Sequence, residues 1–210
     1  MKRTLILLLC GLLLPGLAFA GPGDGADALP PFDGWEAAGD LLPALRQEEA
    51  VNSAVNGGAV RLSEIISEYT GKAMPFDRIA LADVDLDGTP EAVLAFPLFE
   101  HDTGYLVLDR LEGRVTAYEL VSRAMIDLKA DGTFSYSSGA MDNGFGYLAL
   151  DGQAQEIVPV TWCETGKDGT AQYFMDGSPA DETAFQHAYK VQADMPSALW
   201  QSFALETTAP

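Results

Sequence analysis

The sequence predicts an α+β fold, and three features of the 210-residue chain support this class. Before residue 70, apolar residues recur at three- and four-residue spacing, which is typical of amphipathic helices. From residue 76 to residue 175, short apolar runs are separated by Asp-Gly and Glu-Gly pairs, which is typical of antiparallel hairpins. Ser178-Pro179 then provides a helix-start signal. The expected architecture is N-terminal helices, an antiparallel β-meander with an acidic loop between two strands, and a C-terminal helix packed on the sheet.

The first 20 residues have the pattern of a secretory signal peptide. Lys2 and Arg3 make a basic start, 5–17 is an apolar run, and Ala18-Phe19-Ala20 is a small-residue cleavage site. The run is shorter than the roughly 20 residues that a bilayer-spanning helix needs, and no second apolar segment follows. We therefore expect an exported protein, periplasmic or secreted, with no membrane span.

The remainder is expected to form one acidic domain. Cleavage removes Lys2 and Arg3 but no acid, so the formal charge changes from −19 to −21. Residues 21–33 are rich in Pro and Gly and predict a flexible linker, 34–205 a single α+β domain, and 206–210 a polar tail. Such a charge disfavours nucleic acid and anionic membrane surfaces as partners. Solubility alone explains it better than a specific basic partner does.

The two cysteines say little about function. Only Cys163 remains after cleavage, so no intrachain disulfide is possible. A lipid on Cys10 is the alternative to export in soluble form. Leucines precede Cys10, however, where a lipidation site has small residues. Export of a soluble protein is the favoured interpretation.

Two helices are expected at the start of the domain. The first begins near Trp35 and reaches Leu45, although Pro43 argues for an interruption or a late start. Asn56-Gly57-Gly58 then breaks the chain. The second covers 62–69, where apolar residues recur at helical spacing, and Gly71 can end it.

The period then changes to that of strands. Segments 78–82 and 92–96 flank the acidic loop, so the loop joins two extended segments. Further strands are expected at 104–111, 114–121, 124–128, 134–137, 145–150, 157–162 and 171–175. The connections between them carry the turn pairs Glu112-Gly113, Asp131-Gly132, Asp151-Gly152 and Asp168-Gly169. Such short connections favour an antiparallel meander, because parallel strands need a longer crossover.

The helix near the end of the chain has a full start signal. Ser178 is the expected N-cap, Pro179 fits the first helical position, and Asp181 suits the positive end of the helix. The apolar stripe of this helix is expected to consist of Phe185, Ala188 and Tyr189. A last short helix is expected to follow, with Leu199, Trp200 and Phe203 packed on the sheet.

The acidic loop, residues 83–91, is the most informative part of the sequence. It supplies three alternating carboxylates, a glycine for a sharp turn, a threonine that can offer its backbone carbonyl, and a fourth acid. Hard divalent cations need several oxygen ligands that converge in this way. The expected site is one calcium ion, Ca2+, in a calcium loop between two strands, with the ligands Asp83, Asp85, Asp87, Thr89 and Glu91. A solvated turn is the alternative, and magnesium fits less well because it keeps several waters.

This loop differs from that of an EF-hand. Gly88 takes the sixth position, but Leu94 stands at the twelfth, where a bidentate glutamate belongs, and strand-forming residues follow. The spacing resembles the calcium loops of integrin-type FG-GAP repeats and of secreted bacterial domains with a D-x-D-x-D-G-x-x-E element. One departure is Leu86, where such loops often carry Gly or Asn. Residues 60 to 203 also resemble small exported bacterial proteins of unassigned function, a resemblance that implies a fold and a metal but no activity.

Other chemistry is poorly supported. Cys163 and His187 could meet in space, but no nucleophile-elbow motif is present. Glu100-His101-Asp102 could form a polar metal cluster, although a surface loop explains it more simply. Strand aromatics, including Tyr136 and Trp162, could line a carbohydrate-binding face, but such residues usually fill a core.

The leading functional hypothesis is an exported, non-enzymatic binding or interaction domain with a structural calcium ion, whose partner is an unknown protein or carbohydrate ligand. The alternatives are a secreted hydrolase with structural calcium, which needs two converging carboxylates or a Cys163–His187 contact, and a periplasmic inhibitor with an acidic surface.

Overall fold

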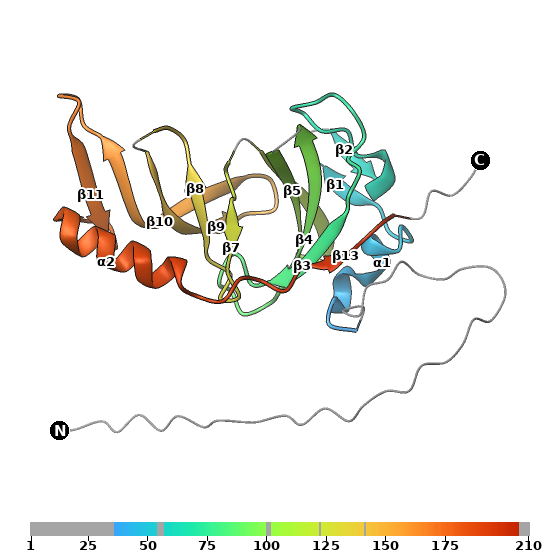
Figure 1. Cartoon of the computed structure of the whole chain (residues 1–210). Coiled ribbons are helices and arrows are strands. Elements are labelled where there is room, and N and C mark those ends of the chain that lie inside the picture. Colours follow the sequence, from blue (N-terminus) through green and yellow to red (C-terminus); the bar gives the residue numbers. More distant parts are fainter. Residues whose placement is uncertain (1–35, 54–56, 100–101, 122, 141, 206–210) are drawn as a thin grey trace, which may run out of the picture.

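The computed structural model describes residues 36–53, 57–99, 102–121, 123–140 and 142–205. The signal segment 1–20, the linker 21–33 and the tail 206–210 lie outside the described residues, as do Glu100 and His101. Two β-sheets dominate the described part of the chain (Figure 1).

The first sheet has seven strands in the order β13-β3-β4-β5-β6-β1-β2. Their bounds in chain order are β1 Val51–Ser53, β2 Gly58–Val60, β3 Arg78–Ala82, β4 Glu91–Phe99, β5 Asp102–Leu111, β6 Arg114–Leu120 and β13 Gln201–Ser202. Strands β3 to β6 form a continuous antiparallel run, whereas β1 pairs with β6 in parallel. The run of consecutive antiparallel strands follows from the short turns between them.

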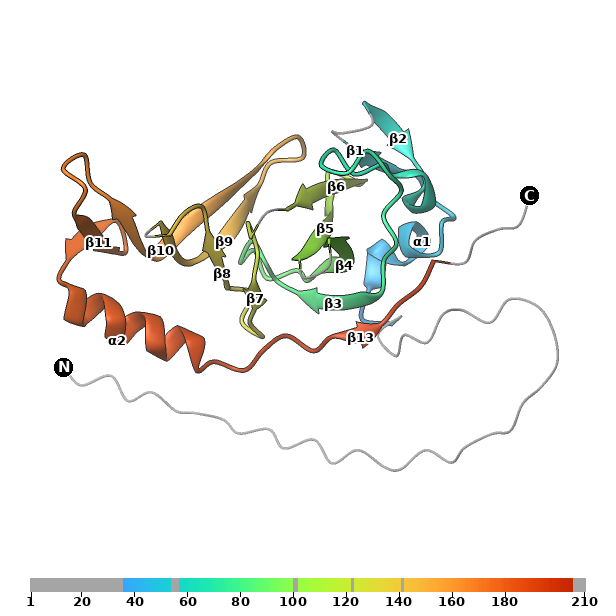
Figure 2. The same ribbon diagram turned by 45° about the horizontal axis from the view of Figure 1, so that its top comes forward.

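The second sheet has six antiparallel strands in the order β12-β11-β10-β9-β8-β7. Their bounds are β7 Asp127–Leu128, β8 Phe134–Ser137, β9 Asn143–Leu150, β10 Gln155–Thr165, β11 Ala171–Met175 and β12 Ser178–Ala180. The helix α2, Glu182–Ala193, follows β12 and runs along this sheet (Figures 1 and 2).

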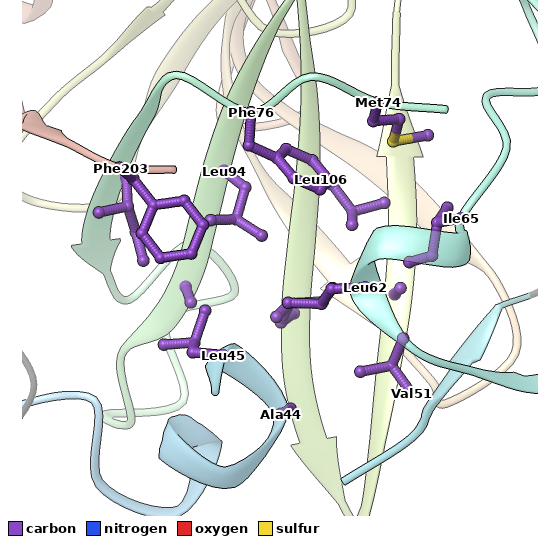
Figure 3. Close-up of a cluster of buried hydrophobic side chains, with 14 of the residues drawn as sticks. Ala44, Leu45, Val51, Leu62, Ile65, Met74, Phe76, Leu94, Leu106 and Phe203 are labelled. Atoms are coloured by element: carbon purple, nitrogen blue, oxygen red, sulfur yellow. The ribbon is translucent and has the colours of Figure 1, made fainter. Parts of the chain in front are cut away.

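One face of the first sheet carries its own core. The short N-terminal elements η1 Gly39–Leu41, α1 Leu42–Leu45 and η2 Leu62–Glu64 bring apolar residues onto this face. Figure 3 shows Leu94 and Leu106 of the sheet among side chains from these elements and from the end of the chain. Burial of these side chains is the main stabilising contribution of this half of the molecule.

The other face of the first sheet packs against the second sheet. This second core joins Val93 and Val107 of the first sheet to Phe134 and Leu148 of the second, and all four side chains are buried. Strand residues two apart point to the same face, so alternate residues of β4 and β5 serve the two cores. The first sheet is thus covered on one face by the short N-terminal elements and on the other by the second sheet.

The predicted α+β class is wrong. Residues in strands far outnumber those in helices within the described structure. The expected N-terminal helices are reduced to a 3-10 turn, a four-residue helix and a second 3-10 turn. Helix growth is restricted at two positions. Gly39 has a positive φ of 51°, and Pro43 lacks the N–H donor of a helical hydrogen bond.

The predicted second helix ends after Glu64 for a different reason. The chain becomes extended at Ile65, and the Glu119 carboxylate accepts hydrogen bonds from the Ser67 hydroxyl and from the Glu68 N–H, the latter at 2.8 Å. A distant strand therefore takes the donor that a continuing helix would have used.

The end of the chain also differs from its prediction. Ser178 and Pro179 belong to β12, and the N-cap of α2 is Asp181, whose carboxylate accepts the Ala184 N–H at 2.8 Å. The last helix expected around Trp200 is absent from the described residues. Its place is taken by β13, which pairs with β3.

Candidate metal centre

The candidate centre lies in the loop that joins β3 to β4. Ala82 and Glu91 face each other across the antiparallel pair, so the two strands hold both ends of the loop. Backbone N–H groups then bond to its carboxylates: Gly88 donates to Asp83 Oδ2 at 3.0 Å, and Asp87 donates to Asp85 Oδ1 at 3.1 Å. These bonds curl the loop around its own acids.

Three of the predicted ligands converge. One carboxylate oxygen from each of Asp83, Asp85 and Glu91 lies within 4.8 Å of the other two, and this group could hold a metal ion. Oδ1 of Asp83 is buried and has no hydrogen-bond partner among the described residues. Burying a carboxylate oxygen without a hydrogen-bond donor lowers the stability of the fold, because folding removes water from the oxygen and no protein donor takes its place.

Glu91 is the most deeply buried acid of the group, with 1% of its surface exposed. Its Oε2 accepts the Val84 N–H at 2.7 Å. Burial, with smaller contributions from the negative charges of Asp85 and Asp109, raises the pKa of Glu91 from 4.5 to about 8. Burial also raises the pKa of Asp85, with a contribution from Asp87 and Asp83. The site therefore disfavours its own negative charge unless a cation is present.

Asp109 of β5 is a nearby acid that sequence reasoning missed. Ala92 pairs with Leu108, so Glu91 and Asp109 occupy the next facing positions on one face of the sheet. Burial raises the pKa of Asp109, and Asp85 and Asp87 raise it further. The strand predicted at 104–111 contained this residue, but only the register between strands places it beside the loop.

Asp87 and Thr89, the other two predicted ligands, are not members of this group of three carboxylates. Asp87 is outside the three converging carboxylates, and its Oδ1 accepts the Thr89 N–H at 2.7 Å. The backbone carbonyl of Thr89 stays a prediction. Asp87 thus shapes the loop as an acceptor for a tight turn.

The loop is held against the second sheet. Val84 is fully buried in the shared core, and its carbonyl accepts the Leu148 N–H at 2.8 Å. Gly132, in the turn between β7 and β8, has a φ of +84°, and a Cβ there would lie 1.7 Å from the Asp83 carbonyl oxygen. Only glycine allows this approach. The candidate centre thus lies where the two sheets meet.

The Cys163–His187 pair considered from the sequence has little support. Cys163 is buried in β10 with 6% exposure, whereas His187 is exposed on α2. The cluster 100–102 lies partly outside the described residues. Of the strand aromatics, Tyr118 and Phe134 fill the core, while Trp162 is half-buried.

Comparisons with known proteins add no family. No family model, no curated protein and no solved structure matches the chain. Within the described ranges, none of the helices combines the length and the apolar character that crossing a bilayer requires. The geometry of the loop and its acids is therefore the basis for inferring a function.

Proposed function

We propose that the protein is an exported calcium-binding domain whose ion has a structural role and whose activity is the binding of a partner. The observation that carries this proposal is the convergence of Asp83, Asp85 and Glu91 within 4.8 Å, with Glu91 almost fully buried. Export is inferred from the signal pattern of residues 1–20.

The donor set favours calcium over other metals. The three side chains offer only carboxylate oxygens, which suit hard cations, and no His or Cys belongs to the group. Calcium accepts six to eight oxygens in irregular arrangements, whereas magnesium requires a nearly regular octahedron and retains waters. A curled loop with an extra acid from β5 supplies oxygens in the irregular manner that calcium tolerates.

The ion would act as a clamp between the two sheets. Asp83 and Glu91 lie on either side of the loop whose backbone contacts Gly132 and Leu148 of the second sheet. An ion that neutralises these acids stabilises the folded chain by mass action, by about 2.7 kcal/mol when free calcium exceeds the dissociation constant about a hundredfold. Such a contribution is a substantial part of a domain's usual stability.

Thermal melts of residues 21–210 in calcium, in magnesium and in chelator test this proposal. We expect calcium to raise the melting temperature, magnesium to have a smaller effect, and Asp85→Ala to remove the response. Glu156→Ala, at an exposed position of β10, is the matched control because it removes one acid that does not belong to the converging group. Equal responses of the two variants would contradict a site in the loop.

A further inference from the structure

The second sheet has one face covered by α2 and one that is not. Phe185, the buried residue of α2, lies 5.0 Å from the ring of Tyr173, and Tyr189 lies 4.7 Å from that of Phe145, measured between ring centroids. Figures 1 and 2 show α2 on this side of β9, β10 and β11. Residues that alternate with Tyr173 and Phe145 therefore point to the opposite face.

The opposite face carries a row of aromatic residues at its outer end. The register aligns Tyr136 with Gly144, Gly144 with Trp162, and Trp162 with Phe174. The rings of Trp162 and Phe174 stack with centroids 4.8 Å apart and planes 11° apart, and both side chains are only half-buried. Toward the first sheet this face continues into the shared core through Phe134. The aromatic row is thus the part of the face that the first sheet leaves partly exposed.

A polar row lies beside the aromatic one, two residues further along each strand. Glu164 faces Gln172, and Asp142 Oδ1 accepts the Thr165 N–H at 2.6 Å. The same residues line a shallow hollow of about 850 Å³ together with Ser138, Thr165, Gly166, Lys167 and Asp168. Burial, with smaller contributions from Cys163 and from Glu164 of this polar row, raises the pKa of Tyr136 to about 12.

The charge of the hollow selects the class of ligand. Its described lining has three carboxylates, from Asp142, Glu164 and Asp168, against one ammonium group, from Lys167. The whole chain has a formal charge of −19. An anionic ligand would be repelled and a cationic one attracted, most strongly where apolar walls limit screening by salt.

We propose that this face binds an arginine or lysine side chain from a basic polypeptide partner. The aliphatic stem of such a side chain packs along the Trp162–Phe174 pair. Its charged end reaches the carboxylates that line the hollow, those of Asp142, Glu164 and Asp168. The two rows are about 7 Å apart, the rise of two strand residues, which suits a long side chain with a cationic end. This inference rests on the proposed function, because it names the partner of a binding domain.

The face, rather than the edge, is the part of the sheet that suits a partner. The edge strand β12 is three residues long and contains Pro179, which has no N–H to offer to an added strand. Main-chain pairing at this edge is therefore disfavoured. Recognition then depends on side chains entering the face.

A labelled hexa-arginine peptide is the probe for this site. Its binding to residues 21–210 is measured by fluorescence anisotropy at about 0.02 M and about 0.15 M salt, with and without calcium. The site variant is Glu164→Gln with Asp168→Asn, and the matched control, with the same change of charge, is Glu156→Gln with Glu48→Gln; Glu156, Glu48, Glu164 and Asp168 are all exposed. Phe174→Leu tests the aromatic pair, and a thermal melt shows whether each variant is folded.

We expect the site variant to bind at least about tenfold more weakly, about 1.4 kcal/mol, with the control nearly unchanged. Equal weakening of both would show a general effect of charge and overturn the proposal, as would absence of peptide binding. Binding of an uncharged hexasaccharide that Phe174→Leu abolishes, without peptide binding, would assign the face to carbohydrate instead. Calcium melts of the same variants keep the two proposals separate, since peptide binding without a calcium response refutes only the metal site.

Discussion

Glu91→Gln should stabilise the calcium-free protein at pH 8 and, at the same time, remove its response to calcium. Glutamine has nearly the same shape, and its oxygen can still accept the Val84 N–H that now bonds to Glu91 Oε2 at 2.7 Å. The substitution removes the charge and replaces the other carboxylate oxygen by an NH2 donor. The variant thus separates the ionisation of Glu91 from its packing.

The magnitude follows from the pKa of Glu91, which burial raises from 4.5 to about 8. Below pH 4.5, Glu91 is protonated in both folded and unfolded chains. As the pH rises toward 8, the unfolded chain loses this proton first, so the calcium-free protein loses stability progressively over that window. Relative to glutamine, which does not titrate, the difference at pH 8 is on the order of 4 kcal/mol.

Urea unfolding of wild type and Glu91→Gln in chelator, at pH 4 and at pH 8, measures this difference. We expect nearly equal free energies of unfolding for the two proteins at pH 4 and a clearly larger one for the variant at pH 8, with the order at pH 8 reversed when calcium is added. Glu156→Gln, which removes an exposed acid, should change little. A variant no more stable than wild type at pH 8, or one that still responds to calcium, would refute the reasoning.

Three further substitutions test neighbouring parts of the structure. Gly132→Ala should lower the free energy of unfolding by at least about 2 kcal/mol, measured in urea, because its φ is +84° and the added Cβ would meet the Asp83 carbonyl oxygen; an unchanged midpoint would contradict the close approach. Asp109→Asn should weaken calcium binding several-fold in a calorimetric titration, because it removes a charge facing Glu91; an unchanged affinity would place Asp109 outside the site. Phe185→Ala should cost about 3–5 kcal/mol in urea unfolding, since this ring is 3% exposed and anchors α2, while calcium affinity should stay the same.

The strands were largely predictable because their signals are local. Runs such as 78–82, 134–137 and 171–175 coincide with β3, β8 and β11, and the Asp-Gly turns carry the expected positive φ, for example +80° at Gly169. Each of these segments is bounded by turn residues whose chemistry acts over a few positions. Nothing in that pattern indicates that the meander divides into two sheets between β6 and β7.

More helix was predicted than the structure contains, because apolar residues at helical spacing also occur in segments that form turns and strands. In the segment 62–69, Leu62 and Ile65 are buried through a 3-10 turn, and the donors that follow bond to Glu119 of a distant strand. Around Phe203 the chain pairs with β3 as a strand. In both segments, hydrogen bonds to residues distant in the sequence replace those of a helix. A single sequence does not reveal which distant residues will lie nearby.

The candidate site was predictable in part. The spacing of Asp83, Asp85 and Glu91 within one loop identified the three acids that converge. Leu86 adopts a left-handed φ of +63°, so the loop curls although it lacks the glycine or asparagine common at such positions. The contributions of Asp109 and Gly132 depend on strand register and sheet packing, which no local pattern contains.

Calorimetric titration of chelator-treated residues 21–210 with calcium tests the central claim most directly. The proposed centre predicts saturation at one ion per chain, with protons released at pH 7 because Glu91, whose pKa is about 8, must ionise to bind the ion. Release is seen as a heat that depends on the ionisation enthalpy of the buffer. No saturable heat, or saturation that Asp85→Ala leaves unchanged, would contradict a calcium site in the β3–β4 loop.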